Sequence, residues 1–278
     1  MVRISDGGSS SFLHEAEKSM CASYKIRAKR HEIQGIGVSV SEGVGEGDLD
    51  ILVQGYKKTD QAPVMVFENG RRVLKNMYFS LCPRWSKAFP FKGTTYNARM
   101  NRPKTDKTGQ LIRHWKTGQP LTEYIFEMPA WKASFRDRHC LVPMSYAIES
   151  SYFGTHAGNM VRFMRQDDAL FFGVGIWDRW IHGETGDVIA SFALLTDNPY
   201  EFFYRTGHDR SFFVIPENRW NTWLKGEFAS PEGAYAFLRE SRIGFDWKAE
   251  IDRPMKKGWD KRAPDDDEIK AIGETVWR

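Results

Sequence analysis

Three side chains in this 278-residue sequence could act together in chemistry, namely Cys21, Glu149 and His208. A cysteine thiol, with a pKa near about 8.5, is a nucleophile in its thiolate form. A carboxyl group in a partly buried site acts as a general acid or base, and histidine titrates near neutral pH. The amide of Asn97 both donates and accepts hydrogen bonds, which suits it to orienting a reacting group. Each of these residue types is more often structural than catalytic. The sequence around each residue therefore has to show whether a catalytic role is plausible.

Each candidate lies within a short distinctive motif. In chain order the motifs are Met20-Cys21-Ala22-Ser23-Tyr24, Pro83-Arg84-Trp85, Tyr96-Asn97-Ala98-Arg99, Arg138-His139-Cys140-Leu141-Val142-Pro143 followed by Glu149, Thr196-Asp197-Asn198, and His208-Asp209-Arg210. Their order and spacing resemble the SRAP family, the SOS response-associated peptidase proteins that shield abasic sites in single-stranded DNA. The resemblance extends from Cys21 to about Leu224, which is roughly three quarters of the chain.

The resemblance implies a set of functional residues. The residues that match catalytic positions of the family are Cys21, Asn97, Glu149 and His208. Those expected to contact DNA are Arg84, Trp85, Arg99 and Arg210. The implied activity is an abasic-site sensor that forms a covalent thiazolidine crosslink with single-stranded DNA, together with autopeptidase or lyase activity.

The crosslinking chemistry requires a free N-terminal cysteine. The α-amine of such a cysteine attacks the open-chain aldehyde of an abasic site to form a Schiff base. The neighbouring thiol then closes a five-membered ring. An internal cysteine has no free α-amine and forms only a labile hemithioacetal.

The sequence departs from the family pattern at several positions. Ala22-Ser23 stands where the family has Gly-Arg, so a DNA-contacting arginine is missing. The Gly-Phe-Tyr-Glu-Trp stretch is reduced to Tyr146–Ser150, and Ser211-Phe212 replaces Met-Pro. Cys21 also follows 20 residues rather than the initiator methionine alone. Three explanations stay open: the chain starts at Met20, residues 1–20 are removed, or the covalent step has been lost.

Two other functions compete with the crosslinking hypothesis. The first is a non-covalent protein on the same fold that binds single-stranded DNA or a modified base. The second is a cysteine peptidase that acts on protein. Structural roles compete as well: Asn97 capping a turn, Glu149 pairing with Arg99, and His208 lying in the core as a satisfied polar residue.

Composition excludes several classes of protein. There are 40 Lys and Arg against 36 Asp and Glu, a net charge of +4, which permits nucleic-acid binding without requiring it. Three cysteines without a Cys-x-x-Cys motif disfavour a disulfide framework and a zinc finger. The sequence has neither a membrane-length apolar run nor a signal peptide, so we expect a cytoplasmic, nucleoid-associated monomer without metal or cofactor.

The pattern of apolar runs predicts an α+β fold, with a mixed or antiparallel barrel-like sheet and short helices. Strands are expected at 51–54, 64–67, 139–143, 188–196 and 212–215, and a hairpin at 161–176 turning at 165–168. Helices are expected at 129–135, 198–206, 216–224 and 231–240, and an exposed basic loop at 100–120. We expect residues 1–20 to form an extension or leader, 21–245 one SRAP-like domain, and 246–278 a charged C-terminal tail.

Overall fold

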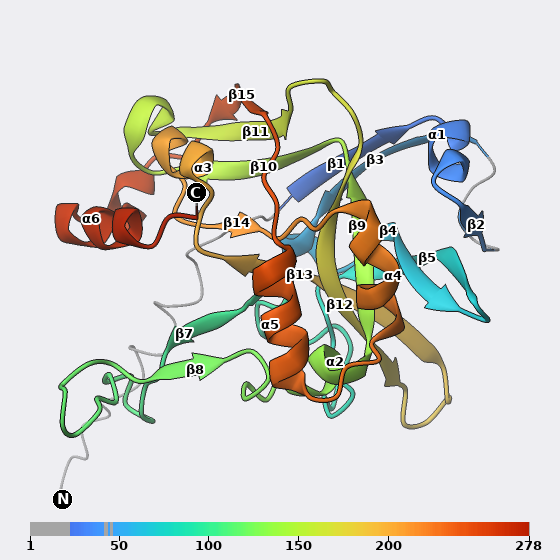
Figure 1. The fold of residues 1–278 in the computed structure, drawn as a ribbon, viewed down its shortest axis with the longest axis horizontal. Coiled ribbons are helices and arrows are strands. Elements are labelled where there is room, and N and C mark those ends of the chain that lie inside the picture. The colour runs from blue at the N-terminus through green and yellow to red at the C-terminus, as the bar shows by residue number, and fades with distance from the viewer. Residues whose placement is uncertain (1–22, 42–43, 45–46, 278) are drawn as a thin grey trace, which may run out of the picture.

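The computed structural model describes residues 23–41, 44 and 47–277, which form two large β-sheets and a two-stranded ribbon with short helices around them (Figure 1). This arrangement confirms the predicted α+β class. No helix within these residues is long and apolar enough to cross a membrane.

The larger sheet closes into a ring of five strands. Its strands, in spatial order, are β13 (Val188–Asp197), β12 (Phe171–Ile181), β9 (His139–Met144), β4 (Gln61–Glu68) and β5 (Arg71–Phe79). The ring closes because β5 also pairs in parallel with β13, through Tyr78 opposite Ser191 and Phe79 opposite Phe192. Closure removes the free edges at which a sheet could pair with another chain. The barrel-like sheet is therefore as predicted.

Three short strands extend this sheet, namely β2 (Val38–Val40), β6 (Asn97–Arg99) and β14 (Ser211–Phe212). Both β6 and β14 pair with β13 near its carboxyl end. Segments that lie far apart in the sequence therefore meet beside the last residues of β13.

The second sheet is antiparallel throughout and packs against the ring. Its strands, in spatial order, are β15 (Trp247–Pro254), β11 (Asn159–Arg165), β10 (Tyr146–Ser151), β1 (Ser23–Ala28) and β3 (Leu49–Gln54). Tyr24 of β1 meets Phe79 of the ring edge-to-face, with ring centroids 5.2 Å apart. Such aromatic pairs stabilise a core beyond the area that they bury.

The helices are short and cover the outside of the sheets. They are α1 (Arg30–Gly35), α2 (Lys132–Asp137), α3 (Glu201–Thr206), α4 (Glu217–Lys225), α5 (Pro231–Ser241) and α6 (Asp266–Glu274). Trp223 fixes α4 to β9, because its indole N–H donates to the Cys140 carbonyl at 3.1 Å and its ring stacks on His139 at 3.7 Å. Ser230 caps α5 by accepting a hydrogen bond from the Gly233 N–H.

The hairpin predicted over residues 161–176 is wrong. The two apolar runs form strands β11 and β12, but β11 pairs with β10 and β15 in one sheet, whereas β12 pairs with β9 and β13 in the other. The segment 165–168 therefore joins two sheets. Local sequence marks a turn between two strands but does not determine which strands then pair.

Two charged segments have more structure than their composition indicated. The basic loop expected at 100–120 belongs to a ribbon whose base is β7 (Asn101–Pro103) paired with β8 (Thr122–Tyr124). The segment expected as a charged tail contains β15, at the edge of the second sheet, and α6. Near its end, the Trp277 N–H donates to the Pro199 carbonyl at 2.9 Å.

A buried carboxylate ties these parts together. Asp197, the last residue of β13, is fully buried and pairs with Arg239 and, at 3.7 Å, with Arg242. The side-chain amide of Asn101, at the base of the ribbon, lies 3.4 Å from the same carboxylate. The Arg242 guanidinium also lies over the rings of Tyr200 at 4.3 Å and Trp277 at 5.3 Å.

We expect Asp197→Asn to lower the free energy of unfolding by about 3 kcal/mol or more, because it leaves a buried cation without its counter-charge. Chemical denaturation monitored by tryptophan fluorescence measures the change. The control is Asp187→Asn, an exposed acid in the turn between β12 and β13, expected to change stability by less than about 0.5 kcal/mol. Equal stabilities for the two variants would contradict the role given to Asp197.

Candidate functional site

The structure brings Glu149 and His208 together. Glu149 lies in β10 and His208 follows α3, and both side chains are 1% exposed. His208 Nε2 lies 3.4 Å from Glu149 Oε2. His208 Nδ1 lies 2.8 Å from the Ser150 carbonyl, which can only accept, so Nδ1 carries a hydrogen and Nε2 faces the carboxyl group. The pair can therefore exchange one proton along the line from Nε2 to Oε2.

The backbone that carries His208 has little freedom. Gly207 ends α3 with φ of +102°, a conformation that favours glycine. Its carbonyl accepts from the Tyr152 N–H at 2.8 Å, and the Ser151 hydroxyl donates to the Thr206 carbonyl at 2.6 Å. Hydrogen bonds from the residues that follow Glu149 thus fix the backbone of the residues that precede His208.

Asn97 and Arg99 come from β6, which is positioned by β13. Asn97 is paired with Leu194 and Arg99 with Thr196. Because side chains alternate along a strand, Asn97 and Arg99 lie on one face while Ala98, fully buried, lies on the other. Asn97 is thus a strand residue and not a residue of a turn.

Arg99 belongs to a group of alternating charges with Asp209 and Arg210. Burial and the neighbouring Arg210 lower the pKa of Arg99 to about 10, and the carboxylates of Asp209 and Asp197 oppose this fall. Burial raises the pKa of Asp209, but the neighbouring side chains of Arg210, His208 and Arg99 outweigh burial and hold that pKa below its usual range. Arg210 Nε lies 3.1 Å from Asp209 Oδ2. All three groups are therefore charged at neutral pH, with one positive charge in excess.

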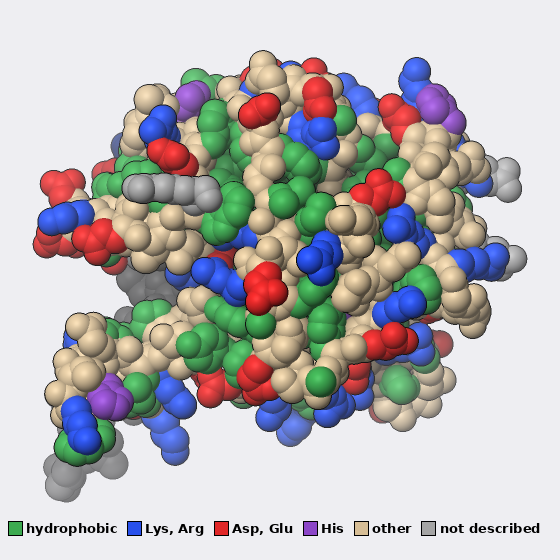
Figure 2. Space-filling view, viewed as in Figure 1, with side chains coloured by type: hydrophobic (Ala, Val, Ile, Leu, Met, Phe, Trp, Pro, Cys, Tyr) green, Lys and Arg blue, Asp and Glu red, His purple; other side chains and the backbone are tan. Residues whose placement is uncertain are grey.

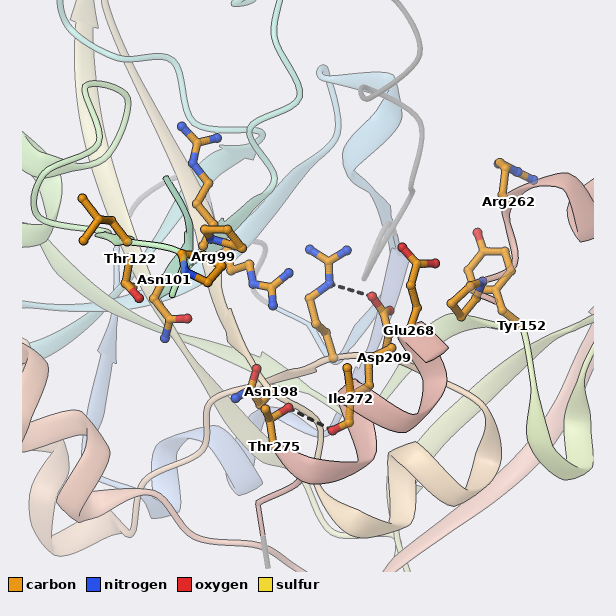
Figure 3. Close-up of a pocket in the computed structure, with 17 residues that line it drawn as sticks. Arg99, Asn101, Thr122, Tyr152, Asn198, Asp209, Arg262, Glu268, Ile272 and Thr275 are labelled. Carbon is orange, nitrogen blue, oxygen red and sulfur yellow. Dashed lines mark hydrogen bonds and ion pairs between the residues drawn. The ribbon is translucent and has the colours of Figure 1, made fainter. Parts of the chain in front are cut away.

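These residues line a cleft of about 520 Å³ between the ribbon and α6 (Figure 3). Four arginines reach it from separate parts of the chain: Arg99, Arg102, Arg210 and Arg262. The lining carboxylates are Asp209 and Glu268. His208 directly precedes two lining residues, and Tyr152, three residues after Glu149, is also a lining residue. The cleft has more cations than anions and adjoins the buried pair, so it suits an anionic ligand.

Part of this cleft was not expected from the sequence. Arg102 lies three residues after the Asn-Ala-Arg motif, but it belonged to the segment interpreted as an exposed loop. Arg262 and Glu268 lie in the segment interpreted as a tail. Only the clustering of charge in these segments could have drawn attention to them, because no local pattern shows that they fold back beside Arg99.

Arg84 and Trp85 do not line the cleft. Arg84 Nε lies 3.5 Å from Asp178 Oδ1, and the Trp85 indole N–H donates to the Pro129 carbonyl at 3.2 Å. Their loop is held by Lys58, whose ammonium group donates to three successive carbonyls of residues 91–93 at 2.8 to 2.9 Å. Trp85 is 54% exposed, so its ring is accessible from solvent. The eight predicted site residues thus do not form one cluster.

The predicted nucleophile, Cys21, lies outside the described residues. The first described residue, Ser23, is paired with Ile148, the residue before Glu149. The other two cysteines, Cys82 and Cys140, are buried, and burial raises the pKa of both thiols. Neither is therefore a ready thiolate. No cluster of three or more His, Cys, Asp or Glu side chains that could hold a metal occurs in the described part of the chain.

Together, the closed barrel-like sheet and the arginine-lined cleft define an α+β protein with a cleft whose charge suits an anionic ligand. Residues 113–248 match the model of the SOS response associated peptidase (SRAP) family. This match supports the family resemblance that the motifs predicted. The matched region includes Glu149 and His208 and begins after Cys21 and Asn97.

Solved structures share the fold at low sequence identity. A protein from Bacteroides thetaiotaomicron is 18% identical, with a TM-score of 0.61 over 90% of this chain and 98% of its own. A protein from Bordetella bronchiseptica is 17% identical, with a TM-score of 0.58 over 85% of this chain and 100% of its own. A phage-related protein from the same organism is 15% identical, with a TM-score of 0.53 over 85% of this chain and 95% of its own. No curated protein matches the sequence.

We expect Gly207→Ala to lower the free energy of unfolding by more than about 3 kcal/mol. A Cβ atom at this position would lie 1.6 Å from the Phe153 carbonyl oxygen, in addition to the positive φ. Thermal denaturation measures the effect. Gly183→Ala is the matched control, because a Cβ there meets no atom within 4 Å. Similar melting temperatures for the two variants would show that the backbone before His208 adjusts freely.

Proposed function

We propose that this protein recognises abasic sites in single-stranded DNA and bonds to them covalently through Cys21. The match to the SRAP family points to a function related to abasic sites in DNA. The observation that carries the proposal is the buried pair of Glu149 and His208, 3.4 Å apart, beside an arginine-lined cleft. On this proposal, the protein acts as a monomer in the cytoplasm, at the nucleoid.

The charge of the cleft supports DNA binding. Four arginines against two carboxylates favour a phosphate backbone, and guanidinium groups bond phosphate oxygens in pairs. Arg102 and Arg262 are additional to the motif arginines, so the cleft keeps its cations although Ser23 stands where the family has arginine. Contacts to the backbone position a strand without reading its sequence. The binding should therefore depend on strand geometry and the lesion rather than on sequence.

Covalent connectivity supports Cys21 as the attacking residue. Two residues of extended chain reach at most about 7 Å. Ser23, the second residue after the cysteine in the chain, lies opposite Ile148, whose neighbour is the proposed acid Glu149.

The proposed reaction needs no external oxidant or cofactor. Glu149 protonates the ring oxygen of the deoxyribose as the bond from that oxygen to C1 breaks, and the C1 hydroxyl gives up its proton to solvent, which yields the aldehyde. The α-amine of Cys21 adds to the aldehyde carbon, and loss of one water gives the imine. The thiol sulfur then bonds to the imine carbon while its proton passes to nitrogen, which closes the thiazolidine.

Proton transfers are assigned to the buried pair. Because His208 Nδ1 is bonded to the Ser150 carbonyl, only Nε2 is available to exchange a proton with Glu149. Each time Glu149 gives up or takes a proton, His208 can return Glu149 to its previous protonation state. Asn97, on the same face of β6 as Arg99, is the residue we assign to orienting the amine or a sugar hydroxyl.

The reaction requires that the active protein begin at Cys21, since an amide nitrogen cannot form the imine. If residues 1–20 are translated, they must be removed. Cleavage between Met20 and Cys21 by the protein's own site would be a peptidase reaction that uses the same Glu149 and His208. The proposal therefore includes autoproteolysis as the step that produces the nucleophile.

We expect protein that begins at Cys21 to form a heat-stable adduct with single-stranded DNA that contains one abasic site. Intact-mass analysis measures the adduct and the N-terminus together. Cys21→Ser should abolish it, because the hydroxyl cannot close the thiazolidine, and Glu149→Gln should slow it by about a hundredfold or more. Cys82→Ala is the matched control and should react normally, since its buried thiol has a raised pKa.

Two outcomes would count against the covalent step. The first is an adduct that survives in Cys21→Ser, and the second is no adduct from protein that begins at Cys21. Salt-sensitive, abasic-selective binding without an adduct would instead favour the non-covalent DNA-binding function. Cleavage of unrelated proteins without DNA binding would favour a peptidase.

We expect Arg99→Ala and Arg210→Ala each to weaken binding to single-stranded DNA by about tenfold, through loss of a charge-assisted hydrogen bond. Each should also reduce the slope of log affinity against log salt by about 0.7, the share of one phosphate contact. Fluorescence anisotropy across a salt series measures both quantities. Arg71→Ala, at an exposed position that begins β5, is the control. An unchanged slope for the cleft variants would rule out phosphate contacts there.

A further inference from the structure

The ribbon at residues 101–124, here called the arm, is an ordered element that projects from the body (Figure 1). Beyond β7 and β8, backbone hydrogen bonds link the middle segment of the arm to the segments on either side of it. The Ile112 N–H donates to the Lys104 carbonyl, and the Leu121 N–H donates to the Ile112 carbonyl, both at 2.8 Å. The chain makes two turns at the far end, over residues 106–110 and 114–119. The arm therefore holds its side chains in defined places.

The arm adds nothing to the hydrophobic core. None of its residues is buried, and every residue in 105–111 and 113–120 is exposed. Because burial of apolar surface is the main source of folding stability, the arm contributes little to it. The arm therefore adds exposed surface to the protein rather than core packing.

That surface is cationic. It carries five cations, namely Arg102, Lys104, Lys107, Arg113 and Lys116. It has two carboxylates, and both are engaged within the arm. Asp106 accepts from the Thr108 and Gln110 N–H groups, and Glu123 accepts from Arg102 at 2.8 Å. The lysines near the turns consequently face solvent with little local compensation.

An aromatic ring stands among these cations. Trp115 is 83% exposed, far more than Trp85 at 54%. The Lys116 ammonium lies 4.7 Å from the centre of its ring, and His114 stacks against it with centroids 6.4 Å apart. Exposed aromatic rings beside cations are the combination that stacks on unpaired bases and bonds the adjoining phosphates. In the space-filling view the arm stands out at lower left, with cationic, histidine and hydrophobic side chains on its surface (Figure 2).

The arm is continuous with the cleft. Its base supplies Arg102, Pro103 and the segment 120–122 to the cleft lining. From Arg102 to the first turn at residue 106, the ribbon extends by about 13 Å. A strand of DNA that leaves the cleft along this wall would pass Lys104 and then reach the two turns.

We propose that the arm is a second contact for single-stranded DNA, which holds the nucleotides adjoining the lesion. Trp115 stacks on a base, and Lys107, Arg113 and Lys116 bond phosphates. This inference rests on the proposed function, in which the cleft binds the strand at the abasic site. The arm lengthens the binding site and leaves the chemistry at the cleft unchanged.

The test compares binding to a short oligonucleotide of about 5 nucleotides, which fills only the cleft, and a long one of about 20. We expect Trp115→Ala to weaken binding to the long strand about tenfold and to leave the short strand unaffected, with Trp115→Phe retaining most of the affinity. Lys107→Ala combined with Lys116→Ala should reduce the salt slope by about 1.4 on the long strand alone. Fluorescence anisotropy measures both, with Arg71→Ala as the control.

The outcomes separate this proposal from the proposed function. If the wild type binds the long strand more tightly than the short one and the arm variants lose that advantage, the proposal stands. If the wild type binds both strands and the arm variants match it, the arm proposal is overturned while the proposed function survives. If the wild type binds neither strand, the proposed function fails and the arm proposal fails with it. Because the arm is outside the core, the variants should melt at the wild-type temperature, which excludes loss of folding as a cause.

Discussion

The buried carboxylate of Asp197 is the constraint on which the rest of the structure depends. A fully buried charge is costly unless cations and hydrogen bonds compensate it, so the chain around Asp197 must bring them there. Arg239 and Arg242, at the end of α5, supply the cations, and Asn101, at the base of the arm, supplies an amide. Arg242 in turn lies against Tyr200 and Trp277. One charge therefore links the end of β13, helix α5, the arm and the end of the C-terminal segment.

The candidate site is assembled around the same end of β13. Strand β6, with Asn97 and Arg99, pairs with residues 194–196 of β13, and β14, which follows Arg210, pairs with residues 196–197. The second sheet brings Glu149 from the opposite side, where it meets His208. Arg99 and Glu149 are thus held by different sheets, because β6 joins the ring and β10 belongs to the second sheet. Packing between the two sheets therefore sets the distance between Arg99 and Glu149.

Burial and charge work against each other in this site. Burial lowers the pKa of Arg99 to about 10, which still leaves the guanidinium fully charged at neutral pH. For Asp209, the surrounding cations outweigh burial, so its carboxylate stays ionised. The alternation of Arg99, Asp209 and Arg210 keeps these charges stable without a ligand and still leaves a net positive charge. On the proposed function, a phosphate group enters a cleft whose charges are already arranged, with little rearrangement.

The sequence by itself determined the local features: the apolar runs that became strands, the short helices, the α+β class and the order of motifs that resembles the family. The Asn69-Gly70 turn between β4 and β5 is one such feature, since both residues adopt positive φ. Only the tertiary structure decided that β11 and β12 belong to different sheets, that Glu149 meets His208, and that Arg102 and Arg262 share a cleft with Arg99. The roles of the predicted catalytic and DNA-contacting residues stay predictions. This difference has a physical reason. Secondary-structure propensity and turn chemistry act between residues that are close in the chain. Strand pairing and charge clusters instead depend on segments that are far apart in the sequence and become buried against each other.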